Sequence, residues 1–483
     1  MALNFIPANR RYPLTAININ NEFAVQGDSI QPYRSLFIGP KLSSGTAPIG
    51  QVTQINSLGD AATKLGRGSA AYDFAKGFFA QTPGHELHVL VIDDASLTKR
   101  NSTLTFTGSS ISAGVLALYI GGTRLSVNVA DGDTIAQVAT NVASAISGQA
   151  DIPFTATASA GVVTLASKNN GLFTQDIQIA HSRGVSESLP TGLALAVADT
   201  TAGAGVPSSL PFSAVDSNTQ YILVSTCFND TGTLGLIDTE LVARNSALRK
   251  VDGYNVIAKY GSLAELTALG NAFNSQFLSI LPAIGNSTES YIAGATVGQL
   301  AKIKAADPAA SVRGAELVGV SPALNSEVLT DSQLNTLLLN GVSAYDVVLG
   351  KVSLALMATT YKTDTDGQAD VSYFDLSVLF VVSYLRYDLD NLSREKFSGA
   401  KIGRDGVRYR QGQKIVTEKS MEAEIISRFD AWEERGLIED RAAFRESLQV
   451  SRHANDVNRM DIILMPNVVN ELRILGVDIR FIL

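Results

Sequence analysis

The last nine residues of the chain, 475–483 (LGVDIRFIL), alternate between apolar and other side chains up to the final carboxylate. A period of two predicts a β-strand with one apolar face. Chain ends are normally polar and frayed, so an end with this pattern is expected to pair with a sheet. The apolar face comprises Leu475, Val477, Ile479, Phe481 and Leu483. Residues 15–25 alternate in the same way, with Ile17, Ile19, Phe23 and Val25 at odd positions.

The two terminal arms allow two hypotheses: they close a sheet of their own chain, or they add strands to neighbouring molecules. Burying five such side chains contributes roughly 8–15 kcal/mol as an upper estimate. Ordering nine backbone residues costs roughly 9–18 kcal/mol. For a single arm, the free energy gained by burial and the cost of ordering the backbone therefore nearly cancel. This favours a reciprocal arrangement in which several arms and ladders support one another.

Composition limits the class of protein. With 483 residues and 45% hydrophobic content, the chain can form about three folded units. A net charge of −8 argues against general affinity for nucleic acid or for an anionic membrane. No apolar run is long enough to span a bilayer, and no signal peptide is expected. The single cysteine, Cys227, lies in an apolar run and is expected to be a buried residue in a reducing compartment.

Strands and helices alternate along much of the chain, which predicts a parallel sheet flanked by helices. The apolar runs predict strands at 33–38, 87–92, 221–224, 254–258 and 277–280. The intervening periodicity predicts helices at 59–81, 233–247, 262–273 and 289–305.

Residues 101–206 interrupt this alternation and contain only nine charged residues in 106. Hairpins are predicted at 115–129 and 154–166, and Asp131–Thr134 is expected to cap a helix between them. A self-contained segment between two halves of another domain usually projects from the surface, so we interpret this one as an inserted β-rich domain.

From Tyr361 onward the chain is rich in charge, with 39 charged residues in 123. Helices are predicted to start at Ser372 with Asp375, and at Thr417. The charges form a basic block at 394–414 and an acidic block at 418–440. These blocks are either mating surfaces or a solvated face with weak local ion pairs. The candidate mating residues are Arg404, Arg408, Arg410, Glu418, Glu422, Glu433 and Glu434.

A search for catalytic motifs finds none. The four histidines are scattered without ligand spacing, and no nucleophile elbow, Walker A loop or dinucleotide fingerprint follows a predicted strand. Residues 364–370 have some features of a calcium loop but lack its distal glutamate. The sequence therefore predicts no catalytic residue, no cofactor and no metal, and it points to assembly.

Several segments resemble the tail sheath proteins of contractile-tailed phages, most closely the Mu-like sheath. They are residues 6–13 (IPANRRYP), 33–39 (YRSLFIG), 65–69 (LGRGS), 252–254 (DGY), 269–275 (LGNAFNS), 359–363 (TTYKT), 383–389 (SYLRYDL), 423–437 (AEIISRFDAWEERGL) and 458–461 (NRMD). The resemblance covers essentially the whole chain, and its C-terminal part is the most specific.

The resemblance implies a multi-domain α/β plus β fold with extended terminal β-arms. Its central parallel-sheet domain would be subtilisin-like in topology but not a protease, since no triad can be placed here. The resemblance divides the chain into an N-terminal arm (1–26), the central domain (27–100 and 207–360), an outward-facing insert (101–206), an α+β tube-facing C-terminal domain (361–474) and a C-terminal arm (475–483).

The implied role is a non-enzymatic subunit that polymerises helically around an inner tail tube and contracts to drive that tube through the host envelope. The implied partners are further copies of the chain, the inner tube protein, and baseplate and tail terminator proteins, with neither nucleic acid nor stable membrane insertion. The implied location is the virion tail, after assembly in the host bacterial cytoplasm. Two alternatives remain: the sheath of an R-type bacteriocin or related injection system, and a hydrolase-like or nucleotide-binding α/β enzyme.

Overall fold

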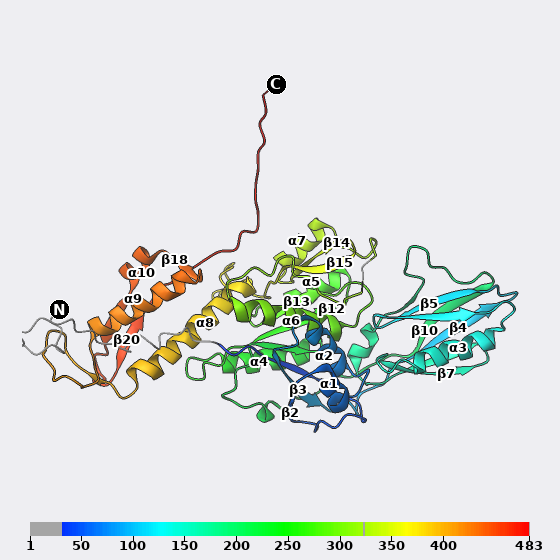
Figure 1. Ribbon diagram of the computed structural model, residues 1–483, viewed down its shortest axis with the longest axis horizontal. Coiled ribbons are helices and arrows are strands. Elements are labelled where there is room, and N and C mark those ends of the chain that lie inside the picture. The colour runs from blue at the N-terminus through cyan, green and yellow to red at the C-terminus, as the bar shows by residue number, and fades with distance from the viewer. Residues whose placement is uncertain (1–30, 322–323, 483) are drawn as a thin grey trace, which may run out of the picture.

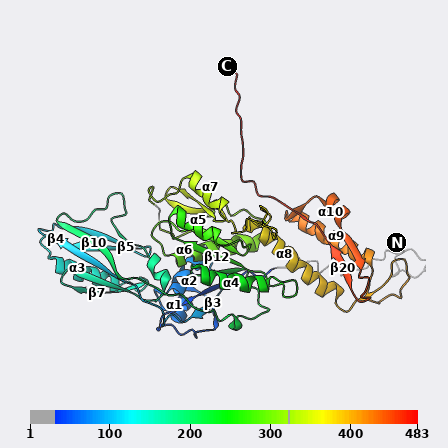
Figure 2. The same cartoon turned by 180° about the vertical axis from the view of Figure 1, so that it is seen from behind.

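The computed structural model describes residues 31–321 and 324–482, and these form an elongated molecule (Figure 1). A central α/β body lies between a β-rich part at one end and a helical C-terminal part at the other, as the view from behind also shows (Figure 2). The N-terminal arm, including Ile17, Ile19, Phe23 and Val25, lies outside the described residues.

The central body contains a six-stranded sheet in the order β13-β12-β11-β1-β3-β2. All its neighbouring strands are parallel except β2, which runs antiparallel to β3. The strands are β1 (Arg34–Pro40), β2 (Val52–Ile55), β3 (Glu86–Ile92), β11 (Leu223–Thr226), β12 (Tyr254–Lys259) and β13 (Leu278–Pro282). The five predicted strands are thus confirmed, with small shifts in their ends. Strands β1, β11 and β13 are almost wholly buried, as is typical of a parallel sheet covered on both faces.

Helices cover both faces of this sheet. They are α1 (Leu58–Leu65), α2 (Ala70–Gln81), α4 (Thr231–Arg244), α5 (Leu263–Asn271) and α6 (Glu289–Ala306). In β12, Val256 joins the core cluster that contains α2 and α6, whereas the next residue, Ile257, joins the cluster of α5. Helices α2 and α6 pack backbone to backbone, because a Cβ at Gly77 would lie only 2.2 Å from the carbonyl oxygen of Tyr291.

The prediction of a single helix over 59–81 is wrong. The chain forms α1 and α2, separated by Gly66 and Gly68, both with positive φ (83° and 85°). Ser69 then caps α2 by accepting a hydrogen bond from the amide of Tyr72. The two glycines end one helix and let the chain turn into the next. Two further elements complete the body: α7 (Asp331–Leu339) and the hairpin β14 (Ala344–Val348) with β15 (Lys351–Leu356).

The segment between β3 and β11 forms two small sheets around α3 (Ile135–Ser147), with strand orders β10-β4-β8-β7 and β6-β5-β9. Its own hydrophobic cluster runs from Leu104 to Leu193. Both predicted hairpins are confirmed as β5–β6 and β7–β8, and Thr134 caps α3. The remaining elements are β4 (Asn101–Gly108), β5 (Gly114–Ile120), β6 (Thr123–Val129), β7 (Phe154–Ser159), β8 (Val162–Ser167), η1 (Leu172–Asp176), β9 (Ile179–His181), β10 (Leu193–Thr201) and η2 (Phe212–Ala214).

The C-terminal part is built on α8 (Leu376–Leu392) and α9 (Glu418–Glu434). Thr417 caps α9 as predicted, but the prediction that Ser372 starts α8 is wrong. Asp375 is the cap because its carboxylate accepts from the amide of Ser377, and residues 372–375 precede the helix. The other elements are η3 (Ser393–Phe397), β16 (Lys401–Ile402), β17 (Ile415–Val416), β18 (Ile438–Glu439), α10 (Arg441–Ser447), β19 (Gln449–Arg452), β20 (Met460–Ile463) and β21 (Asn467–Val468).

Helix α8 belongs to two hydrophobic cores. Its first half, including Leu379 and Phe380, packs into the core of the central body. Its second half, including Tyr384 and Leu385, packs into a separate C-terminal cluster. Among the helices that the structure describes, none is both long and apolar enough to cross a membrane.

Candidate assembly site

The C-terminal unit, residues 381–468, is held together by a buried charged network between α8 and α9. The side chain of Asp388 is fully buried and accepts hydrogen bonds from Arg428 and from the indole nitrogen of Trp432, the latter at 2.7 Å. Phe429 stacks on Phe444 at a centroid distance of 4.2 Å. A buried charge with fixed partners orients the two helices relative to each other.

Beside this network lies an apolar groove of about 480 Å³. Its walls come from the end of α8, η3, α9 and β20, and include Leu389, Phe397, Met421, Ile425, Met460 and Ile462. Strand β20 pairs only with β19, in a two-stranded sheet. Within the described chain, the second edge of β20 has no partner strand. The C-terminal unit thus combines an open groove with an open strand edge.

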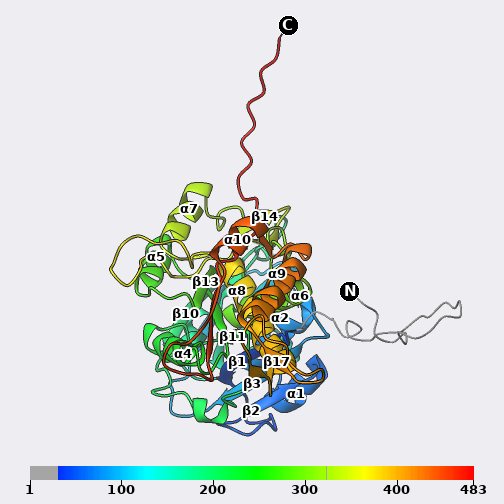
Figure 3. The same ribbon diagram turned by 90° about the vertical axis from the view of Figure 1, so that its left-hand side faces the viewer.

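The C-terminal arm leaves this unit as an extended segment that points away from the molecule (Figures 1 and 3). Leu475, Val477, Ile479 and Phe481 are 70–81% exposed. Residues 475–482 form no hydrogen-bonded ladder with any other described part of the chain. The structure therefore does not show this arm closing a sheet of its own chain, and strand pairing with a neighbour stays a prediction. Leu483 lies outside the described residues.

The root of the arm is fixed to the central body. Arg473 forms an ion pair with Asp375, the residue that caps α8. Arg313 donates a hydrogen bond to the carbonyl oxygen of Arg473 at 3.0 Å. Burial raises the pKa of Asp375, and the charge of Arg473 opposes that rise. The arm is thus anchored at its base and free beyond residue 474.

The structure separates the candidate mating residues into two groups. Arg404, Arg408 and Arg410 are exposed in the loop between β16 and β17. Glu422 and Glu434 are exposed on α9, and Glu433 is half-buried there. Glu418 is also half-buried, and it accepts a hydrogen bond from the amide of Arg452 at 3.0 Å. A mating role for these residues stays a prediction.

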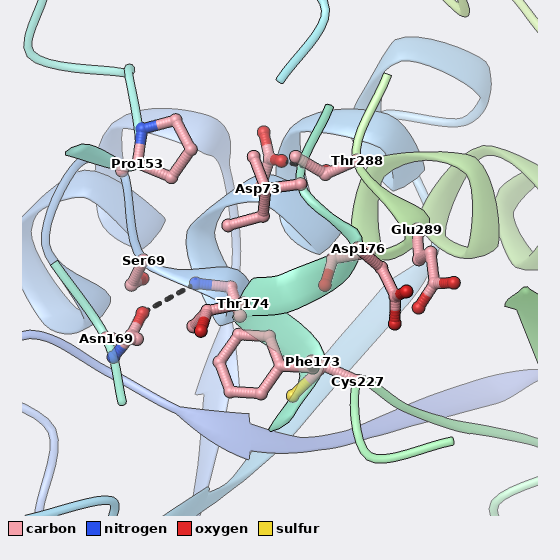
Figure 4. A pocket seen from close by; sticks show the side chains of 14 residues that line it. Ser69, Asp73, Pro153, Asn169, Phe173, Thr174, Asp176, Cys227, Thr288 and Glu289 are labelled. Carbon is pink, nitrogen blue, oxygen red and sulfur yellow. Dashed lines mark hydrogen bonds between the residues drawn. The ribbon is translucent and has the colours of Figure 1, made fainter. Parts of the chain in front are cut away.

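A second possible site lies at the carboxyl end of β11, where α/β enzymes commonly bind ligands. Here η1 enters from the β-rich segment, and Phe173 and Asp176 line the opening with Cys227, Asp73 and Glu289 (Figure 4). The space that remains is only about 20 Å³, enough for about one water molecule. The chain itself fills this part of the crevice, whereas a neighbouring hollow of about 260 Å³, lined by residues that include Cys227, Asn229 and Lys259, remains open beside it.

Two ionisable side chains, Glu289 and Cys227, lie buried in this crevice. Glu289 accepts hydrogen bonds from Asn229 at 2.8 Å and from the amide of Tyr260 at 2.6 Å. Burial, followed by the charge of Asp176, raises the pKa of Glu289. Burial also raises the pKa of the Cys227 thiol, which opposes formation of a nucleophilic thiolate. Among the described residues, no group of three His, Cys, Asp or Glu side chains is arranged to hold a metal.

Known protein families match the C-terminal part of the chain and also the chain as a whole. Residues 368–482 match the family described as the phage tail sheath C-terminal domain. The whole chain is 31% identical, over 487 residues and the full length of both proteins, to the Mu-like prophage FluMu tail sheath protein of Haemophilus influenzae. The chain therefore belongs to the tail sheath family of Mu-like prophages.

Solved structures of sheath proteins are also similar. The crystal structure of the sheath tail protein from Desulfitobacterium hafniense is 11% identical, with a TM-score of 0.49, over 94% of this chain and 100% of that one. The contracted helical sheath of the anti-feeding prophage is 10% identical, with a TM-score of 0.49, over 98% of this chain and 99% of that one.

Sequence reasoning missed the Asp388 network, the groove and the anchored root of the arm. One signal was available: Asp388 follows Leu385 by three residues, so a charge lies on the apolar stripe of a predicted helix. Such a charge needs a buried partner. The partner, Arg428, is 40 residues away, and no local pattern identifies it.

Proposed function

We propose that this chain is the structural subunit of a contractile tail sheath, which polymerises helically around an inner tube and contracts to drive the tube through a host envelope. The observation that carries the proposal is the C-terminal arm: an anchored strand-like segment whose apolar face is exposed and has no partner within the described chain. The membership of the whole chain in the sheath family supports the same role.

In this mechanism, the arms of neighbouring copies add strands to the C-terminal unit. The open edge of β20 supplies backbone groups for pairing, and the apolar groove beside it accepts alternate side chains. Such contacts are heterologous, and when their rotation does not close they generate a helix instead of a ring. An arm anchored at Arg473 can turn at its root while its ladder stays paired, which lets the bodies rotate between an extended and a contracted packing.

The proposal assigns the other parts of the chain as follows. The central body, 27–100 and 207–360, is the subtilisin-like domain without proteolytic chemistry, and 101–206 faces outward. The C-terminal domain, 361–474, faces the inner tube. Baseplate and terminator proteins cap the two ends of the sheath, and assembly precedes incorporation into the virion tail. A bacteriocin sheath would use the same mechanism, and neighbouring capsid genes would separate the two cases.

The test is polymerisation of the purified full chain, followed by negative-stain microscopy and sedimentation. We expect tubes from the unmodified chain. Phe481→Asp should abolish them, because it places a charge on the apolar face of the arm. Ile482→Asp is the matched control, since it adds the same charge at the next residue, on the opposite face.

Two outcomes would contradict the proposal. Normal tubes from Phe481→Asp would exclude the arm as the linking element. An unmodified chain that stays monomeric at all concentrations would exclude the sheath role. It would favour the alternative of a hydrolase-like or nucleotide-binding α/β enzyme.

A further inference from the structure

The four-stranded sheet of the β-rich segment has two open edges, β10 and β7. Across the described residues, the main chain of 194–201 bonds only to β4, and that of 154–159 only to β8. Most of these residues are exposed, and no described strand pairs with either edge. An open edge presents a row of unpaired amide and carbonyl groups.

Soluble proteins usually protect such edges with lysine, proline, a bulge or a very short strand. Strand β7 (FTATAS) has none of these residues and no charge. Strand β10 (LALAVADTT) has one charge, Asp199, and a register irregularity between Asp199 and Thr201. That charge is turned inward, since Asp199 accepts from Arg100 at 3.0 Å and from Ser102 at 2.6 Å. The first six residues of β10 are therefore as unprotected as β7.

The directions of the two edges fit each other. Every neighbouring pair in the order β10-β4-β8-β7 is antiparallel. Because the number of strands is even, β10 and β7 run in opposite directions. A second copy of the sheet, placed beside the first without being turned over, would therefore continue the antiparallel alternation from β10 of one copy to β7 of the next.

The outward face across the sheet is also suited to a continuous ladder. Thr103 and Thr105 of β4 lie opposite Ala198 and Ala196 of β10, and Thr157 of β7 lies opposite Thr164 of β8. These side chains are small or β-branched and uncharged, so no like charges would oppose one another where two copies meet.

We propose that the β-rich segments of neighbouring subunits join edge to edge, β10 to β7, with a second copy of this chain as the partner. The inference rests on the proposed sheath, because a helical assembly repeats one heterologous contact in the same orientation. The contact is separate from the arms: it lies at the opposite end of the molecule from the C-terminal unit (Figures 1 and 2). It adds lateral cohesion to tubes that the arms link.

Cysteine cross-linking tests this contact directly. The single native cysteine is buried, so the unmodified chain gives a low background. A chain with both Thr157→Cys and Ala196→Cys is assembled into tubes and treated with a short bismaleimide, which tolerates a shift of register. We expect a ladder of covalent dimers, trimers and longer chains, at least roughly tenfold stronger than from dispersed subunits, because assembly raises the effective concentration.

The single variants are the controls. Neither Thr157→Cys nor Ala196→Cys alone should give a ladder, since head-to-tail pairing brings together one thiol from each edge. Dimers from Ala196→Cys alone would mean a two-fold contact and would overturn the proposal. Microscopically normal tubes of the double variant that give no ladder would also overturn it, while leaving the sheath role intact. Failure of the unmodified chain to form tubes would instead overturn the proposed function, and this inference with it.

A charge variant gives an independent readout. Ala196→Lys places a charge at the edge, and Thr103→Lys places the same charge on the same face of the interior strand β4. We expect Ala196→Lys to lower the temperature at which tubes fall apart and Thr103→Lys to change it less. Equal effects of the two variants would contradict edge pairing.

Discussion

The central body and the C-terminal unit differ in how far each is completed by its own residues. Strands β1, β11 and β13 of the body are buried on both faces, and helices cover the sheet. The C-terminal unit has a small cluster of its own, an open groove and an arm whose apolar face is exposed. One chain can therefore carry both a self-sufficient scaffold and a unit whose apolar surfaces remain open within the described residues.

The largest expected effect tests the scaffold. Phe37 is fully buried in β1 and stacks on Phe74 at 4.2 Å. Phe37→Ala should lower the free energy of unfolding of the dispersed subunit by about 4 kcal/mol, because it removes apolar contacts and leaves a cavity. Val382→Ala, on an exposed position of α8, should change it by less than about 0.5 kcal/mol. Denaturant unfolding measures both, and equal effects would contradict a body stabilised by its own buried core.

The next effect tests the C-terminal unit. Asp388→Asn removes the buried charge that Arg428 and Trp432 share, and should destabilise this unit by about 3 kcal/mol. Asp390→Asn is the control, because it makes the same change two residues later at a partly exposed ion pair with Lys250. We expect proteolysis within 381–468 to increase for Asp388→Asn only. Similar cleavage of the two variants would show that the network does not hold the unit together.

These cases also show what sequence could predict. Apolar runs located the strands of the parallel sheet because a strand buried on both faces must be apolar throughout, as at Leu223 and Val224. The same logic failed for 59–81, where Gly66 and Gly68 split one apolar periodicity into two helices.

The assembly site was predictable only in part. The alternation of 475–483 identified the arm because the signal is local. The groove and the Asp388 network were not predictable, because both depend on contacts between residues far apart in the chain. The ion pair between Asp375 and Arg473, which anchors the arm, joins residues 98 positions apart in the chain.

A smaller effect concerns pH at the junction of the body with the β-rich segment. Burial raises the pKa of Asp73 to about 6 from its usual 3.8, and Thr288 donates a hydrogen bond to it. Between pH 4 and 6 the folded state therefore holds a proton that the unfolded state has lost, so stability falls as the pH rises through this window. The fall is up to about 3 kcal/mol. Asp73→Asn should flatten this part of the profile of melting temperature against pH, and an unchanged slope would contradict the assignment.

The smallest effect concerns surface charge. Arg408→Glu with Arg410→Glu should reduce assembly on the inner tube while leaving the melting temperature of the subunit nearly unchanged, because exposed pairs contribute only about 0–1 kcal/mol each. Lys99→Glu with Lys302→Glu makes the same charge change on exposed residues outside the C-terminal unit. High salt should weaken assembly of the unmodified chain in the same direction. If both double variants assemble equally well, the basic loop is an ordinary solvated surface.

Helix α8 gives the molecule a mechanical property. Its 17 residues make a rod about 25 Å long, with its first half embedded in the body and its second half in the C-terminal unit. A helix gripped at both ends transmits torque with little twist of its own. Any rotation imposed on the C-terminal unit would therefore be transmitted through α8 to the body. The π-helical turn η3 follows α8 directly, and its Phe397 packs against the same C-terminal cluster.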